Sequence, residues 1–190
     1  FGADPARVAG AAVAFAGGLR DAGIMATAKH FPGHGGAADS HAGPASVDLD
    51  AESLRRTELV PFDALVDDGV GLVMLNHVSY SGLGPLPASL SPAAYELLRS
   101  TGFDGVAVTD SLGMGAVNLR WPFGEAAVMA VGAGADAVLA TDGHQARAMR
   151  DALVGAVSTG RIPEARLDEA VARMLTLRGA DPATMLCPTG

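Results

Sequence analysis

The stretch Gly105-Val-Ala-Val-Thr-Asp110 is a short apolar run that ends in a carboxylate, and the fold prediction starts from it. Runs of the same kind cover residues 24–28, 71–75 and 135–140. None of them alternates apolar with polar residues, as a strand with one face in water would. We therefore expect four strands covered on both faces, which is typical of a parallel sheet.

Helical patterns separate these runs. A helix is expected over residues 4–22, because Asp4 suits the cap, Pro5 suits the first helical position and apolar residues recur every three or four positions. Further helices are expected at residues 51–68 (with a break near Pro61), 91–100, 123–131, 145–158 and 164–177. This alternation predicts either an open doubly wound sheet or part of a (β/α)8 barrel. No dinucleotide-type glycine motif follows the first run, which favours the barrel.

The residues with the most useful chemistry stand where the predicted strands end. Lys29 and His30 follow the first run, Asn76 and His77 follow the second and Asp110 the third. Asp142, near the end of the fourth, is either a helix cap or a solvent-facing residue. Barrel enzymes build their active sites at the carboxyl ends of their strands, so we expect a candidate active site there.

Composition argues against several classes of partner and site. The formal net charge is −8 with no basic stripe, which argues against a nucleic-acid partner. The single cysteine, Cys187, excludes a disulfide framework, and no apolar run is long enough to predict a membrane span. No signal peptide is visible, and the chain starts at Phe1 rather than Met. We expect the N-terminus to be incomplete, which leaves a cytoplasmic and an exported location both open.

The densest polar cluster is Lys29-His-Phe-Pro-Gly-His-Gly35, followed by Asp39-Ser-His41. One interpretation is a polar surface loop. A second is a metal site, because the histidines and the aspartate are suitable ligand types, although their spacing matches no short ligand motif. The third is acid/base chemistry. On a bent loop, Asp39 can bond one imidazole nitrogen of His41 and leave the other nitrogen to exchange a proton with a substrate.

Asp110 also has two interpretations. It could cap the helix that follows, as aspartates after strands often do. Beside a histidine acid/base, it becomes a candidate nucleophile or a stabiliser of positive charge in the transition state.

Several segments resemble the β-N-acetylhexosaminidase branch of glycoside hydrolase family 3. They are Phe1-Gly-Ala-Asp-Pro5, Ala28-Lys-His-Phe-Pro-Gly-His-Gly35 with Asp39-Ser-His41, Pro61-Phe62, Val73-Met-Leu-Asn-His77, Pro87-Ala-Ser-Leu-Ser91 and Gly102-Phe-Asp-Gly-Val-Ala-Val-Thr-Asp-Ser-Leu-Gly-Met114. The resemblance covers the chain to about Leu177, and its most specific part is the combination of residues 29–35 with residues 39–41.

The resemblance implies a (β/α)8 barrel that cleaves terminal β-linked sugars with retention, through a covalent glycosyl–aspartate intermediate. It makes Asp110 the nucleophile, His41 the acid/base and Asp39 the residue that orients His41. Lys29 and His30 match residues that bind sugar hydroxyls.

The two remaining histidines of interest, His34 and His77, are assigned to the lining of the cleft as further substrate-binding candidates, with a structural role as the alternative. No metal and no cofactor is expected. Trp121 and Pro122 lie in a short loop after Met114 and could line or cover the site.

The chain is short for a whole barrel. We expect only the last four β/α units, as a partial barrel domain over residues 1–178 with a C-terminal tail over residues 179–190. The family pattern includes a further acidic residue and an arginine in the first half of the barrel. An open half-barrel would also expose strand edges and an apolar interior. Three expectations stay open: the chain is a fragment, a second chain or a second copy completes the barrel, or the fold has been rebuilt.

The expected activity is hydrolysis of terminal β-linked N-acetylhexosamine from glycans such as peptidoglycan fragments or chitin oligomers. A phosphorylase of the same family stays open, because a histidine acid/base tolerates an incoming phosphate anion better than a carboxylate would. A metal-dependent hydrolase that uses the histidine cluster is another alternative. The non-enzyme alternative is a half-barrel that binds sugar or a partner chain.

Overall fold

The structure, a computed structural model, describes residues 1–184. Cys187 and the last part of the predicted tail lie outside the described residues. The described part of that tail holds a short 3-10 helix, Pro182–Thr184. No helix within residues 1–184 combines the length and the hydropathy that a membrane crossing requires.

A parallel four-stranded sheet forms the centre of the fold, as predicted. Its strands run in the order β1 (Thr27–Phe31), β3 (Leu72–Leu75), β5 (Val106–Ser111) and β6 (Ala137–Leu139). Thr27 lies opposite Leu72 and Leu72 opposite Val106, and the register shifts between Lys29 and Phe31 in β1 and between Val108 and Ser111 in β5. Among the described residues, β1 and β6 are the outer strands, each hydrogen-bonded to a neighbour on one side. The prediction of an α/β fold with parallel strands is confirmed.

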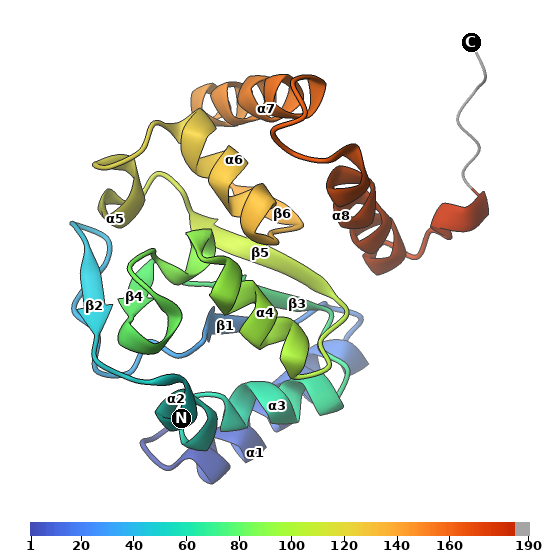
Figure 1. The fold of residues 1–190 in the computed structure, drawn as a ribbon. Coiled ribbons are helices and arrows are strands. Elements are labelled where there is room, and N and C mark those ends of the chain that lie inside the picture. Colours follow the sequence, from blue (N-terminus) through green and yellow to red (C-terminus); the bar gives the residue numbers. More distant parts are fainter. Residues whose placement is uncertain (185–190) are drawn as a thin grey trace.

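Helices connect the strands and pack around the sheet (Figure 1). α1 lies against α3 at one end of the sheet, and α6 lies against α7 at the other. The helices of the predicted set are α1 (Pro5–Asp21), α2 (Ala51–Arg56), α3 (Val60–Asp67), α4 (Pro92–Ser100), α6 (Phe123–Ala133), α7 (Gly143–Ser158) and α8 (Glu164–Leu177).

Local capping explains several helix starts. The Asp4 carboxylate accepts the Arg7 N–H at 2.8 Å and starts α1, as predicted. The expected break near Pro61 separates α2 from α3, and Pro61 falls in the first turn of α3, where a missing N–H costs nothing. Asp142 is the cap of α7, since its carboxylate accepts the N–H groups of His144 and Gln145.

Two predicted boundaries were wrong. The first strand starts at Thr27 rather than at Ile24, and Ile24 and Met25 are more than half exposed, so their apolar character did not mark a buried strand. Asp110 lies within β5 instead of after it, because the pairing with β6 continues to Ser111.

Short elements without a sequence pattern were missed. A second parallel pair joins β2 (Ala45–Val47) to β4 (Val78–Tyr80), and these strands arise in the loops after β1 and β3. The four-residue helix α5 (Gly115–Asn118) follows β5. Three or four residues are too few for either periodicity to show. These elements matter because they lie beside the carboxyl ends of the central strands.

The core consists mainly of Ala, Val and Leu, with Phe31 packed edge-on against Phe62. One buried charge cluster closes the opposite, amino-terminal end of the sheet. The Asp136 carboxylate is fully buried and accepts hydrogen bonds from Arg99, Arg166 and Arg173, and also from the Ala107 N–H. Such a carboxylate is stable in the interior because each oxygen has charged donors.

Candidate active site

The predicted site residues come together at one edge of the sheet. Lys29 and His30 lie near the carboxyl end of β1, His77 lies two residues beyond β3, and Asp110 is the penultimate residue of β5. Because β1, β3 and β5 are adjacent and parallel, these positions share one end of the sheet.

Asp110 and His30 form the centre of the cluster. The His30 Nε2 atom lies 3.5 Å from the Asp110 Oδ2 atom, and both side chains are partly buried. The other carboxylate oxygen, Oδ1, accepts the Ser111 N–H at 2.7 Å. Burial lowers the pKa of His30, and the nearby Asp110 carboxylate offsets this only in part. A neutral His30 is therefore expected near pH 7, so its contact with Asp110 does not join two full charges.

A cavity of about 470 Å³ opens beside His30, and Asp110 is not among the residues that line it. Lys29, His30 and His34 line its polar end together with Glu58, while α1 and α3 supply an apolar wall. The His34 ring stands edge-on to the His30 ring, with 6.0 Å between centroids. Lys29 is exposed. Hydroxyl-rich ligands suit such a mixed lining, in which a few polar groups set the orientation.

Asp39 and His41 form the predicted pair. The Asp39 Oδ1 atom lies 2.5 Å from His41 Nδ1 and also accepts the His41 backbone N–H at 2.9 Å. These hydrogen bonds hold the pKa of Asp39 below its usual value. With Nδ1 engaged by the carboxylate, Nε2 is the nitrogen of His41 left to exchange a proton. Both side chains are exposed, so the proton can pass to a ligand.

The loop that carries this pair is attached to the segment after Asp110. The Gly115 N–H donates to the His41 carbonyl at 2.9 Å, and the Ala116 N–H donates to the Ser40 carbonyl at 3.3 Å. Ser40 is buried between two exposed neighbours. The structure thus connects the two predicted catalytic segments through backbone hydrogen bonds.

Three polar side chains hold the turn at Gly33 and Gly35; of these, Tyr80 and Glu58 were not singled out from the sequence, and Asn76 was noted only for its place at a strand end. The Tyr80 hydroxyl donates to the Gly33 carbonyl, and Asn76 Nδ2 donates to the Tyr80 hydroxyl at 2.8 Å. The Glu58 carboxylate lies against Gly35, and the Gly35 N–H acts to lower its pKa. Burial raises the pKa of Glu58 and raises that of Tyr80 to about 12.

Sequence offered little sign of these contacts. Asn76 stood at a strand end, but Tyr80 belongs to the missed strand β4 and Glu58 to the α2–α3 connection. The one signal in the sequence was the glycine at position 33. The structure explains it, because a φ of +137° and the contact with Glu58 leave no room for a side chain there.

His77 lies at the predicted end of the sheet, but its side chain contacts protein groups and not the cleft. Its side chain is buried, and both ring nitrogens have protein partners: Nδ1 lies 2.7 Å from the Ser89 hydroxyl and Nε2 lies 2.8 Å from the Ser111 carbonyl. A carbonyl can only accept, so Nε2 carries the proton and Nδ1 accepts from Ser89. Burial lowers the pKa of His77. This geometry corresponds to the structural alternative, because no ring nitrogen is left for a substrate.

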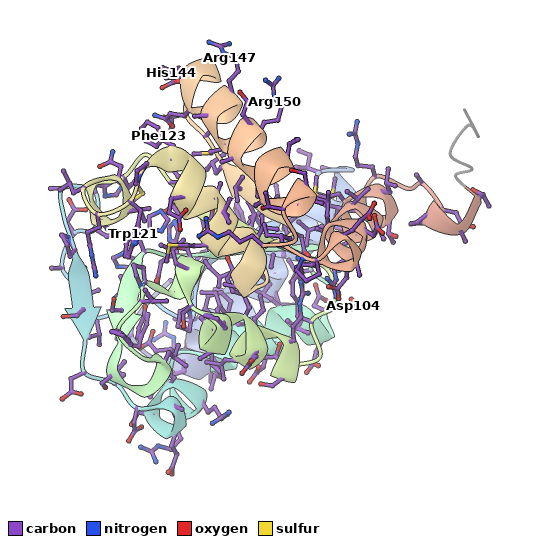
Figure 2. All side chains as sticks on the ribbon, turned by 45° about the horizontal axis from the view of Figure 1, so that its top comes forward. Asp104, Trp121, Phe123, His144, Arg147 and Arg150 are labelled. Carbon is purple, nitrogen blue, oxygen red and sulfur yellow. The ribbon has the colours of Figure 1, made fainter. Side chains whose placement is uncertain are left out.

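Trp121 packs against the core close to the start of α6, with the Arg120 guanidinium 4.4 Å from its ring centroid (Figure 2). Trp121 therefore packs the loop between α5 and α6 against the core. Within residues 1–184, no group of three or more His, Cys, Asp or Glu side chains is arranged to hold a metal ion.

Comparison with known proteins gives consistent matches. The family model "Glycosyl hydrolase family 3 N terminal domain" matches residues 1–177. The β-hexosaminidase LpqI of Mycobacterium tuberculosis is 41% identical over 191 residues, which cover 96% of this chain and 49% of that protein. A β-hexosaminidase of Methylococcus capsulatus is 36% identical over 151 residues, covering 78% of this chain and 45% of that protein. The chain therefore spans about half the length of the curated relatives it matches.

Solved structures agree with these matches. The structure of M. tuberculosis LpqI superposes with a TM-score of 0.90 at 41% identity, over 96% of this chain and 56% of that chain. A glycoside hydrolase family 3 β-N-acetylglucosaminidase from Paenibacillus sp. str. FPU-7 gives a TM-score of 0.82 at 41% identity, over 92% of this chain and 35% of that one. The expected fold class, part of a TIM-type (β/α) barrel, agrees with this similarity.

Proposed function

Because this chain belongs to glycoside hydrolase family 3, we propose that it supplies the bond-cleaving groups of a retaining β-N-acetylhexosaminidase. The observation that carries the proposal is the Asp39–His41 pair, which is held by a loop bonded to the segment that follows Asp110. Retention requires one carboxylate at the anomeric carbon and a second group that first donates and later accepts a proton. Asp110 and His41 match those two requirements.

The proposed reaction has two steps. In the first, an Asp110 carboxylate oxygen attacks the anomeric carbon while the bond to the leaving oxygen breaks, and protonated His41 donates its Nε2 proton to that oxygen. In the second, neutral His41 takes a proton from water, the water oxygen attacks the anomeric carbon, and the bond to Asp110 breaks. Asp39 fixes the ring through Nδ1 and stabilises its protonated form.

The substrate-binding roles follow from the cavity. Lys29, His30 and His34 line its polar end, where donors would meet sugar hydroxyls, and His30 also lies 3.5 Å from Asp110. We propose a positioning role for His77 in place of the predicted substrate contact, because its hydrogen bond to Ser111 fixes the backbone beside Asp110. The proposed substrates are glycans that end in β-linked N-acetylglucosamine, since similar proteins of known structure are titled β-N-acetylglucosaminidases.

An assay with nitrophenyl N-acetyl-β-glucosaminide tests the proposal. We expect the protein to release nitrophenol and Asp110→Ala to abolish the release. Asp104→Ala is the matched control, because Asp104 is an exposed aspartate just before the same strand, at the end opposite to Asp110. Equal turnover by Asp110→Ala and the control would remove Asp110 as nucleophile. Phosphate-dependent formation of sugar 1-phosphate would identify the phosphorylase instead.

We further propose that residues 1–178 act as part of a barrel that a second polypeptide segment or a second copy completes. β1 and β6 have free edges among the described residues, and exposed apolar side chains lie near both, including Phe15 by β1 and Val154 and Leu167 by β6. The molar mass of the active species in solution tests this. A monomer of this chain with full activity would contradict it, and a stable but inactive monomer would favour the sugar-binding half-barrel.

A further inference from the structure

The first turn of α5 holds the loop that carries the Asp39–His41 pair. The first amide groups of a helix have no acceptor within the helix. Here two of them donate to the loop instead: Gly115 to the His41 carbonyl and Ala116 to the Ser40 carbonyl. The side chains of the Asp39–His41 pair are exposed, but the backbone that carries them is hydrogen-bonded to α5.

Gly115 makes this attachment possible. A Cβ atom at position 115 would lie 2.7 Å from the carbonyl carbon and oxygen of Ala42 and 2.9 Å from the His41 carbonyl oxygen. These are backbone atoms, which cannot rotate away as the end of a side chain can. Any side chain at position 115 must push the loop away from α5.

The segment between Asp110 and Gly115 is itself well held. The Ser111 carbonyl accepts both the Met114 N–H at 3.0 Å and the His77 Nε2–H at 2.8 Å. A fixed connector therefore joins the Asp110 carboxylate to the point where the His41 loop is attached. The position of His41 relative to Asp110 depends on this connector.

We propose that Gly115 is a positioning residue for the acid/base step. It sets the distance between His41 and the leaving oxygen on the anomeric carbon that Asp110 attacks. The inference rests on the proposed roles of Asp110 and His41. Gly115 itself touches neither substrate nor the reacting atoms. A displacement of about 1 Å in a catalytic group can cost on the order of 10²-fold in rate.

Leaving-group dependence gives the test. We expect Gly115→Ala to lower kcat/KM by about 10²-fold for a substrate with a poor leaving group, which needs a proton from His41. For a dinitrophenyl glycoside, whose leaving group departs without a proton, kcat/KM should fall by no more than about 3-fold. Gly132→Ala is the matched control, because Gly132 is exposed on α6 with no atom within 4 Å of the added Cβ.

A double variant separates positioning from general damage. If Gly115 acts through His41, adding Gly115→Ala to His41→Ala should change kcat/KM no further for either substrate. Equal losses for both leaving groups, or additive losses in the double variant, would overturn the inference while leaving the proposed function intact. Full activity of Asp110→Ala would instead overturn the proposed function.

Amide hydrogen exchange on the unaltered protein provides a second measurement that does not depend on how the variant folds. The Gly115 and Ala116 amides have no helical acceptor, so their protection reports attachment of the loop. We expect both to exchange slowly. Exchange at the rate of an unstructured peptide would contradict the inference.

Discussion

Replacing His77 by Phe removes both hydrogen bonds of a buried ring while keeping its shape. The change leaves the Ser89 hydroxyl and the Ser111 carbonyl without their partner in a site that excludes water. An unsatisfied buried polar group costs about 1–3 kcal/mol, and the Ser89 hydroxyl can rotate towards another acceptor, so we expect a loss of about 2–4 kcal/mol in unfolding free energy. With a urea m-value of about 2 kcal/mol/M, the midpoint should fall by about 1–2 M.

Urea unfolding followed by circular dichroism measures this shift. His144→Phe is the matched control, because His144 is exposed at the start of α7 and projects away from the protein (Figure 2). It should change the unfolding free energy by less than about 0.5 kcal/mol. If His77→Phe also stays within that margin, the hydrogen bonds to Ser89 and Ser111 do not stabilise the fold, and the positioning role of His77 is wrong.

Acid should narrow the difference between the unaltered protein and His77→Phe. Burial lowers the pKa of His77 in the folded state, so the unfolded chain takes up the proton first as pH falls below about 6.5. The unaltered protein therefore loses stability in that range through this residue, whereas the Phe variant has no proton to gain there. A gap between the two that stays constant from pH 7 to pH 5 would argue against a buried neutral His77.

Two further pairs of variants test the buried Asp136 cluster and the Glu58 contact. Asp136→Asn should cost about 3–5 kcal/mol in unfolding free energy, because three arginines then surround a neutral group. The control Asp151→Asn removes a charge from an exposed pair with Arg150 and should cost less than about 1 kcal/mol. Equal losses in the two variants would refute the importance of burial. Glu58→Ala should lower kcat/KM by about 10-fold through loosening of the turn at Gly35, while Glu58→Gln keeps an oxygen for the Gly35 N–H and most of the activity. A Gln variant as impaired as the Ala variant would contradict a positioning role for Glu58.

Apolar runs and helix caps were sufficient to predict the central architecture. Asp4 and Pro5 marked the start of α1 because capping depends on neighbouring residues alone. The run from Gly105 to Thr109 located β5, since a strand buried on both faces needs an unbroken apolar sequence. Ile24 and Met25 show the limit of this approach: they are as apolar as a buried strand but lie outside the sheet.

The contacts that organise the site depend on residues far apart in the chain. The Asp39–His41 pair was predictable because its two members are two residues apart. His77 reaches Ser111 across 34 positions and Tyr80 reaches Gly33 across 47, so neither partner could be found from local spacing. The need for a glycine at position 115 likewise depends on the Ala42 backbone, which only the fold places beside it. Where two backbone segments approach closely, the sequence shows only a glycine and does not reveal its partner.

The role of Asp110 as nucleophile can be measured directly by trapping the glycosyl intermediate. A fluorinated N-acetylglucosaminide with a good leaving group should form the ester faster than water can break it, and mass spectrometry of the intact protein should show one added sugar residue. Peptide mapping should place that residue on Asp110. An unlabelled protein that turns over with inversion at the anomeric carbon, or a label on another side chain, would contradict the central claim.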